Sequence, residues 1–194
     1  MMAEYPIIFN GEEVRAYRAG LKTSTRCPVQ NPDHYACLTG DCQHGCQSEC
    51  AESLAEQSPW GKPGDSLVIQ EAVATDGPWN IPSACNLWYP ADGDGPRSSQ
   101  MRSAVNMPRW ACRSTPLITD IRAERVQDIE PDDCEAEGIK QRWTCIDPGL
   151  GSYAHDNDVV DDFHATWDSL YAAKGRGWNA NEWVWVIGFE RFGG

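Results

Sequence analysis

The sequence predicts a mixed, strand-rich α+β domain, and three segments carry that prediction. Residues 183–190 are apolar on both faces, which is typical of a strand buried inside a sheet. Residues 117–126 alternate apolar and polar side chains, as a half-exposed strand does. Residues 159–171 instead place apolar side chains at helical spacing. The chain has 194 residues, 41% of them hydrophobic, so we expect one domain that spans residues 1–194.

The N-terminal part of the chain predicts a strand, a short helix and a second strand. Residues 6–9 form an apolar run that suits a short buried strand. A helix starts at Asn10 or at the glycine after it, and it ends at Gly20, because glycine takes the left-handed conformation that closes a helix. Residues 23–29 favour extended chain. Lys22 therefore lies at a corner between a helix and a strand.

The middle of the chain predicts further strands and one short helix. A turn at residues 61–65 precedes a predicted strand at residues 66–73, and residues 87–89 predict a short strand. Residues 96–110 predict a basic, polar loop. Residues 131–138 predict a short helix, with proline at its start, acidic residues in its first turn and glycine after it.

Two stretches have the composition of insertions, residues 30–60 and residues 139–157. The first is rich in cysteine, and its candidate zinc ligands are Cys37, Cys42, Cys46 and Cys50. In a helical conformation the last three share one face, and Cys37 or His34 would complete a tetrahedral zinc site. The alternative interpretation is a thiol-rich loop that binds no metal.

The net charge of −13 limits the partners that we expect. A protein that binds duplex DNA along its backbone needs a broad basic surface, which this composition argues against. Basic residues gather locally at residues 15–26 and 97–113, which suits a small anionic or single-stranded ligand; the alternative is solvated surface charge. The sequence opens with no signal-peptide pattern and contains no apolar run long enough to span a membrane, so we expect a cytoplasmic location and no membrane partner.

Five motifs follow one another along the chain: PIIF at 6–9, AGLKTSTR at 19–26, KPGDSL at 62–67, MPRW at 107–110 and WVWV at 183–186. In this combination and order the sequence resembles the ASCH domain of the PUA-like superfamily, in the long form found in bacteriophages and prophages. The resemblance implies a PUA-like mixed β-barrel with short flanking helices and two insertions. It also implies a phage or prophage protein in the cytoplasm of a bacterial host.

The resemblance implies binding of RNA or of a nucleoside. The small bacterial members of the family are N4-acetylcytidine amidohydrolases, and their catalytic lysine, threonine and glutamate match Lys22, Thr25 and Glu137. Glu135 is the neighbouring alternative for the glutamate. The implied chemistry requires no cofactor, and zinc would be structural only.

Hydrolysis of an amide gives each of these three residues a role. The lysine amine would take a proton from a hydroxyl or from water, and the glutamate would pass a proton to the departing N4. Side chains three positions apart on a regular strand point to opposite faces, so Lys22 and Thr25 converge only if the corner at Gly20 turns Lys22 back. The alternative is that Lys22 binds a phosphate or carboxylate and Thr25 packs in the core.

Arg26, Arg109 and Trp110 are the predicted contacts to the substrate or nucleic acid. Arg109 and Trp110 follow a Met-Pro turn and would clamp a base or phosphate through charge and stacking. The alternative for Trp110 is that it covers the end of the barrel. Trp183 and Trp185 lie in the most apolar strand, so we assign them to the core.

The function that the resemblance implies is hydrolysis of an N4-acetylcytidine-type amide, in a nucleoside or in single-stranded RNA. One alternative is a non-catalytic module that binds single-stranded RNA, single-stranded DNA or a modified base. Another is an acidic phage protein that binds a host factor.

Overall fold

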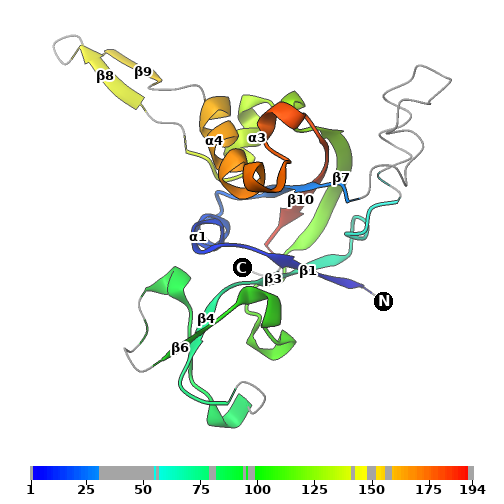
Figure 1. Ribbon diagram of the computed structural model, residues 1–194, viewed down its shortest axis with the longest axis vertical. Coiled ribbons are helices and arrows are strands. Elements are labelled where there is room, and N and C mark those ends of the chain that lie inside the picture. Colours follow the sequence, from blue (N-terminus) through cyan, green and yellow to red (C-terminus); the bar gives the residue numbers. More distant parts are fainter. Residues whose placement is uncertain are drawn as a thin grey trace. The chain divides into compact units, whose positions relative to one another are not determined.

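The computed structural model describes residues 2–30, 55, 57–78, 82–93, 95, 99–140, 143–147, 152–155 and 159–191. The fold is α+β, with a mixed five-stranded sheet in the order β1-β3-β7-β10-β2, a three-stranded sheet in the order β5-β4-β6, and the hairpin β8-β9 (Figure 1). Within the described helices, none is both long and apolar enough to cross a membrane.

The strands are β1 (Glu4–Ile8), β2 (Ser24–Pro28), β3 (Ser66–Gln70), β4 (Val73–Thr75), β5 (Leu87–Trp88), β6 (Gln100–Arg102), β7 (Leu117–Arg125), β8 (Trp143–Asp147), β9 (Ser152–His155) and β10 (Trp183–Glu190). The α-helices are α1 (Gly11–Arg18), α3 (Pro131–Ala136) and α4 (Val159–Tyr171). Short 3-10 turns are η2 (Pro82–Ala84), η3 (Pro90–Asp92), η4 (Ala104–Asn106), η5 (Arg109–Ala111), η6 (Val126–Asp128), η7 (Ala172–Lys174) and η8 (Trp178–Ala180).

The chain folds into two compact units, each assembled from separate stretches of sequence. The first unit contains Met1–Gly20, Pro59–Thr119 and Phe189–Gly194. The second unit contains Leu21–Ser58 and Asp120–Gly188.

In the first unit, β1 runs parallel to β3, with Tyr5 opposite Leu67. Helix α1 follows β1, and the Asn10 side chain caps it by accepting hydrogen bonds from two backbone amides of the first turn, while Glu13 accepts from the Asn10 amide. Gly20 follows the helix in the left-handed conformation, at φ 74°. The helix predicted up to Gly20 is therefore confirmed.

The single strand predicted at residues 66–73 is wrong, because the chain forms two strands, β3 and β4, with a break at Glu71. The Glu71 carboxylate is buried and accepts two hydrogen bonds from Arg113, at 2.7 and 2.9 Å. The polar segment predicted as a loop at residues 96–110 also contains a strand, β6, which pairs with β4. A small apolar cluster supports this part of the unit: Val73, Met107 and Ala111.

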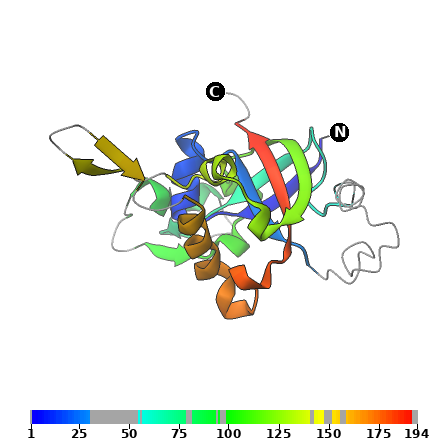
Figure 2. The same cartoon turned by 90° about the horizontal axis from the view of Figure 1, so that it is seen from above.

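In the second unit, β2 runs antiparallel to β10, with Arg26 opposite Val186. Strand β10 also lies beside β7, as Figures 1 and 2 show. Helices α3 and α4 pack next to each other through one core cluster: Val126, Ile129, Cys134, Val159, Phe163, Trp167, Val184 and Val186. Trp185 is buried, which confirms its assignment to the core, whereas Trp183 is half-buried and carries the Arg125 guanidinium over its ring.

Closure of the sheet into a barrel is not observed among the described strands, since β1 and β2 stand at the two ends of the strand order. Each of these outer strands contains a proline, Pro6 or Pro28, which has no amide hydrogen to donate to a further strand. The second predicted insertion, residues 139–157, contains the hairpin β8-β9. Most of the first one, residues 30–60, lies outside the described residues.

Candidate functional site

Lys22 and Glu137 meet in the second unit, and each follows the end of a helix. Gly20 closes α1 two residues before Lys22, and Glu137 is the C-terminal cap of α3. The two residues form an isolated antiparallel bridge. Lys22 Nζ donates to Glu137 Oε2 at 2.7 Å and to the Glu137 carbonyl oxygen at 3.2 Å. A cation at the C-terminal end of a helix interacts favourably with the helix dipole, and here it also neutralises the carboxylate.

The Lys22–Glu137 pair is almost completely removed from solvent, because the two side chains are 2% and 7% exposed. Glu135, the alternative glutamate, is exposed, so the carboxylate that reaches Lys22 is that of Glu137. A buried charge is tolerated only when it is paired and hydrogen-bonded, and the close contact satisfies both groups.

Arg26 is the second cation at Glu137. Its side chain is 1% exposed, and Nη1 donates to Glu137 Oε1 at 3.3 Å. The same guanidinium donates to Glu124 Oε1 at 2.5 and 3.0 Å and to Asp133 Oδ2 at 2.9 Å. Arg26 was predicted to contact substrate, but in this structure its guanidinium contacts three carboxylates of the protein instead. Arg26 therefore binds Oε1 of Glu137, and Lys22 binds Oε2.

Arg122 extends this network towards the surface. It donates to Glu124 Oε2 at 3.0 Å and to both oxygens of Asp133 at 3.0 and 3.1 Å. Partial burial by itself would raise the pKa of Asp133, but the charges of Arg26 and Arg122 outweigh it and lower that pKa below its usual value. We call the set of Lys22, Arg26, Arg122, Glu124, Asp133 and Glu137 the buried ion network.

Thr25 does not join Lys22 and Glu137. Lys22 and Arg26 reach the same carboxylate, so they share one face of the extended segment, and alternation places Thr25 on the opposite face. Thr25 is buried opposite Ile187 of β10, and in the described part of the chain no hydrogen bond links it to Lys22 or Glu137. The structure therefore brings together two of the three predicted catalytic residues.

Ser24 is the residue that sequence reasoning missed on this face. It lies between Lys22 and Arg26, it is 7% exposed, and its hydroxyl has no hydrogen-bond partner among the residues that the structure describes. Its position in the sequence could have identified it, because Ser24 follows Lys22 by two residues and alternate residues of a strand share a face. No spacing in the sequence identifies the acidic partners of Arg26, because they lie far from it along the chain, in β7 and α3.

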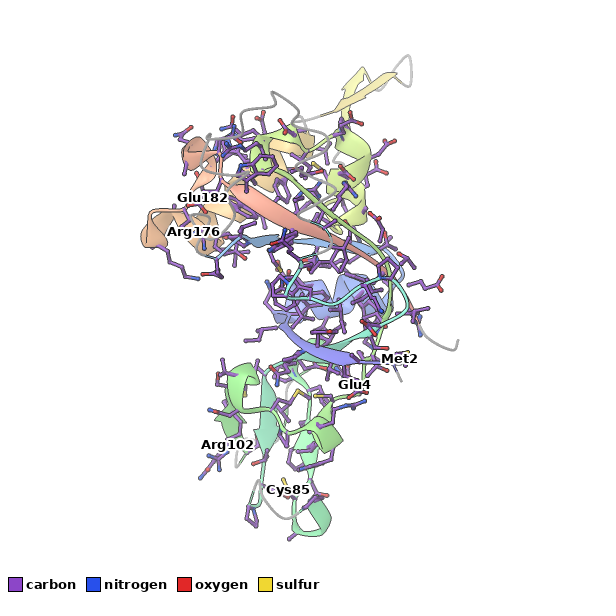
Figure 3. All side chains as sticks on the ribbon, turned by 90° about the vertical axis from the view of Figure 1, so that its right-hand side faces the viewer. Met2, Glu4, Cys85, Arg102, Arg176 and Glu182 are labelled. Carbon is purple, nitrogen blue, oxygen red and sulfur yellow. The ribbon has the colours of Figure 1, made fainter. Side chains whose placement is uncertain are left out.

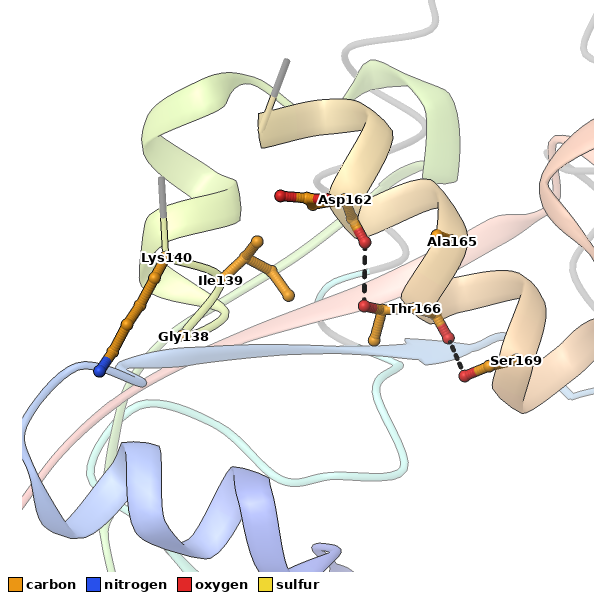
Figure 4. Close-up of a pocket in the computed structure, with 7 residues that line it drawn as sticks. All are labelled: Gly138, Ile139, Lys140, Asp162, Ala165, Thr166 and Ser169. Carbon is orange, nitrogen blue, oxygen red and sulfur yellow. Dashed lines mark hydrogen bonds between the residues drawn. The ribbon is translucent and has the colours of Figure 1, made fainter. Parts of the chain in front are cut away.

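An open groove of about 650 Å³ begins at the residue after Glu137 (Figure 4). It runs between the segment Gly138, Ile139 and Lys140 and the face of α4 that carries Asp162, Ala165, Thr166 and Ser169. The Thr166 and Ser169 hydroxyls donate to carbonyl oxygens of α4, at 2.9 and 2.7 Å, which leaves their lone pairs available as acceptors. Lys140 is exposed at its edge and is the positively charged residue of the lining.

Arg109 and Trp110 lie in the first unit, in the turn η5. Arg109 forms a two-point ion pair with Glu4, which is labelled in Figure 3, at 2.8 Å for each contact. The hydrogen bond from Arg109 lowers the pKa of Glu4. Trp110 is 42% exposed. A ligand that binds Arg109 would have to replace Glu4.

The predicted zinc ligands Cys37, Cys42, Cys46 and Cys50 lie outside the described residues, so the zinc site stays a prediction. Among the residues that are described, no group of three or more histidine, cysteine, aspartate or glutamate side chains is arranged to hold a metal ion.

Comparisons of this chain with models of protein families, with curated proteins and with solved structures found no match.

Proposed function

We propose that this protein hydrolyses the amide of an N4-acetylcytidine-type base, in a nucleoside or in single-stranded RNA, with Lys22 and Glu137 as the reacting pair. One observation carries the proposal: an amine and a carboxylate 115 positions apart in the sequence lie 2.7 Å apart. These are two of the three residues that the resemblance to the ASCH domain matches. The PUA-like barrel is part of the same proposal.

The hydrogen bond between Lys22 and Glu137 supplies both an acid and a base. When substrate covers the pair, transfer of one proton from Lys22 Nζ to Glu137 Oε2 leaves a neutral amine and a neutral carboxylic acid. The amine takes a proton from water as the water oxygen attacks the acyl carbon. The acid gives its proton to N4 as the C–N bond breaks, so cytidine leaves and the ion pair of the free protein is restored.

Burial of the pair sets a condition on this mechanism. Because the Lys22 and Glu137 side chains are 2% and 7% exposed, the residues that cover them must move before a substrate reaches them. Arg26 keeps its hold on Glu137 Oε1 during such a movement, which preserves the orientation of the carboxylate towards Lys22. The network would then act as a support that is already organised before substrate binds.

The test is chromatography of the cytidine that the full-length protein releases from a panel of N4-acylated nucleosides, free and within short RNAs. We expect turnover by the unaltered protein and a loss of about 100-fold or more in kcat for Lys22→Met and for Glu137→Gln. Arg122→Met, at the solvent side of the network, is the matched control and should keep most of the activity. Folded protein that releases no cytidine from any member of the panel would contradict the proposal.

A second candidate function is non-catalytic binding of single-stranded nucleic acid, and the exposure of Trp110 favours it. A base would stack on the indole, and a phosphate would replace Glu4 at Arg109. This candidate predicts RNA binding that weakens as salt rises, with Trp110→Ala reducing affinity by about 1–3 kcal/mol. Binding that is unaffected by Trp110→Ala would rule out this surface.

A further inference from the structure

We infer that Ser24, and not Thr25, provides the hydroxyl of the proposed site, where it holds the water that attacks the acyl carbon. The inference rests on the proposed function. It begins from an anomaly in the second unit: Ser24 is 7% exposed, yet its hydroxyl neither donates a hydrogen bond to any of the described residues nor accepts one from them. Buried polar atoms are almost always paired, so an unpaired one is retained at a cost and indicates a partner that arrives later.

The position of Ser24 identifies that partner. Lys22 and Arg26, two residues to either side, both bind the Glu137 carboxylate, so the Ser24 side chain is directed to the same face as theirs. In the register of β2 and β10, Ser24 stands opposite Gly188, which contributes no side chain to that face. The strand geometry therefore directs the Ser24 hydroxyl to the face of the strand that carries the amine and the carboxylate of the reacting pair.

The hydrogen-bonding capacity of a serine hydroxyl matches what the attacking water needs. The hydroxyl can accept one hydrogen from a water molecule whose other hydrogen is directed at the neutral Lys22 amine. The water oxygen then keeps a lone pair for the acyl carbon. No covalent bond to Ser24 forms or breaks in this step: the water loses one proton to Lys22 and adds to the carbonyl, and Ser24 fixes its orientation.

Thr25 does not offer this arrangement. Its side chain lies on the other face of β2, opposite Ile187, and in the described part of the structure its hydroxyl makes no bond to either reacting residue. The motif that the sequence matched therefore holds two hydroxyls, and the strand geometry selects the one two positions after the lysine.

The experiment measures activity and stability on the same three variants of the full-length protein: Ser24→Ala, Ser24→Thr and Thr25→Val. We expect Ser24→Ala to lower kcat about 100-fold with little change in KM, because a positioning contact to water is lost while substrate binding remains. Ser24→Thr, which keeps a hydroxyl, should recover a large part of kcat. The loss on Thr25→Val should be smaller than the loss on Ser24→Ala.

The stability arm separates this role from a structural one. Removal of a buried hydroxyl that has no partner leaves the urea midpoint of Ser24→Ala unchanged or raises it, whereas removal of a structural hydrogen bond would lower it. An active Ser24→Ala variant, or one with a lowered midpoint, would overturn the inference and leave the proposed function intact if Lys22→Met is inactive. An unaltered protein that is folded but inactive on the whole panel overturns both.

Discussion

At the scale of single residues, Arg26 fixes the orientation of the Glu137 carboxylate. Its guanidinium satisfies oxygens of three carboxylates at once, and its side chain is almost entirely buried. Arginine suits this position because its five N–H donors are fixed in one plane and its charge is permanent. Lysine, with a single charged atom, would not reach all three carboxylates.

Replacement of Arg26 should therefore destabilise the protein far more than replacement of its exposed neighbour. We expect Arg26→Met to lower the free energy of unfolding by about 3–5 kcal/mol, because Glu124, Asp133 and Glu137 each lose a buried partner and only Lys22 and Arg122 remain to neutralise three carboxylates. Arg122→Met should cost about 1 kcal/mol or less, since the Arg122 side chain is 41% exposed and solvent screens its ion pairs. Urea denaturation followed by circular dichroism measures both values, and equal losses would refute this assignment.

The sequence analysis selected Lys22 and Glu137 as candidate site residues, but it did not predict the residues around them. The resemblance placed both residues, and the structure puts them in contact. The resemblance matched Thr25 and gave no role to Ser24, because the direction of a side chain depends on where the strand begins after the corner at Gly20. It also missed Glu124 and Asp133, because only the folded chain brings β7 and α3 to Arg26.

At the scale of elements, left-handed glycines end the two helices that lead to the site. Gly20 follows α1 at φ 74°, and Gly138 follows α3 at φ 88°. A residue with a Cβ atom would be strained in this conformation, so glycine is favoured at both positions. The two glycines define the corners at which Lys22 and Glu137 lie.

Gly11, the first residue of α1, and Gly20, which follows the helix, should respond in opposite directions to substitution by alanine. We expect Gly20→Ala to lower the free energy of unfolding by about 1–2 kcal/mol through backbone strain alone, because no atom lies within 4 Å of the added Cβ. Gly11→Ala, inside the first turn, should raise it by about 0.4–1 kcal/mol, because alanine restricts the unfolded chain without strain. Thermal or urea denaturation tests the pair, and a Gly20→Ala protein as stable as the original would contradict the account.

The long periodic elements were predicted correctly, and the errors fall where tertiary contacts override local pattern. The strand at residues 183–190 has the expected bounds, and the predicted helix of apolar residues 159–171 is observed as α4, which begins at Val159. The break between β3 and β4 was missed because Glu71 becomes a buried residue only through its pairing with Arg113. Strand β6 was not predicted because its sequence is polar, and its extended conformation is stabilised by pairing with β4.

At the scale of the whole molecule, acid should weaken the fold through its paired carboxylates. The charges of Arg26 and Arg122 hold the pKa of Asp133 in the folded protein below its usual value, so its contribution to stability is fully present above the usual pKa and is lost as the pH falls through the lower folded pKa. Asp92 shifts in the same direction, because hydrogen bonds from Arg113 and the nearby arginine charges lower its pKa. We expect the urea midpoint to fall below about pH 4, and to fall less steeply in Asp133→Asn. A midpoint that rises on acidification would contradict this sign.

The most direct test of the central claim is the turnover of N4-acetylcytidine by Lys22→Arg. Arginine keeps the positive charge beside Glu137 but cannot give up its proton, so it preserves the ion pair and removes the base. We expect a protein that unfolds cooperatively near the original urea midpoint and whose kcat falls by about 100-fold or more. Folded Lys22→Arg protein that releases cytidine as fast as the unaltered protein would show that the Lys22–Glu137 pair is not the site of the reaction.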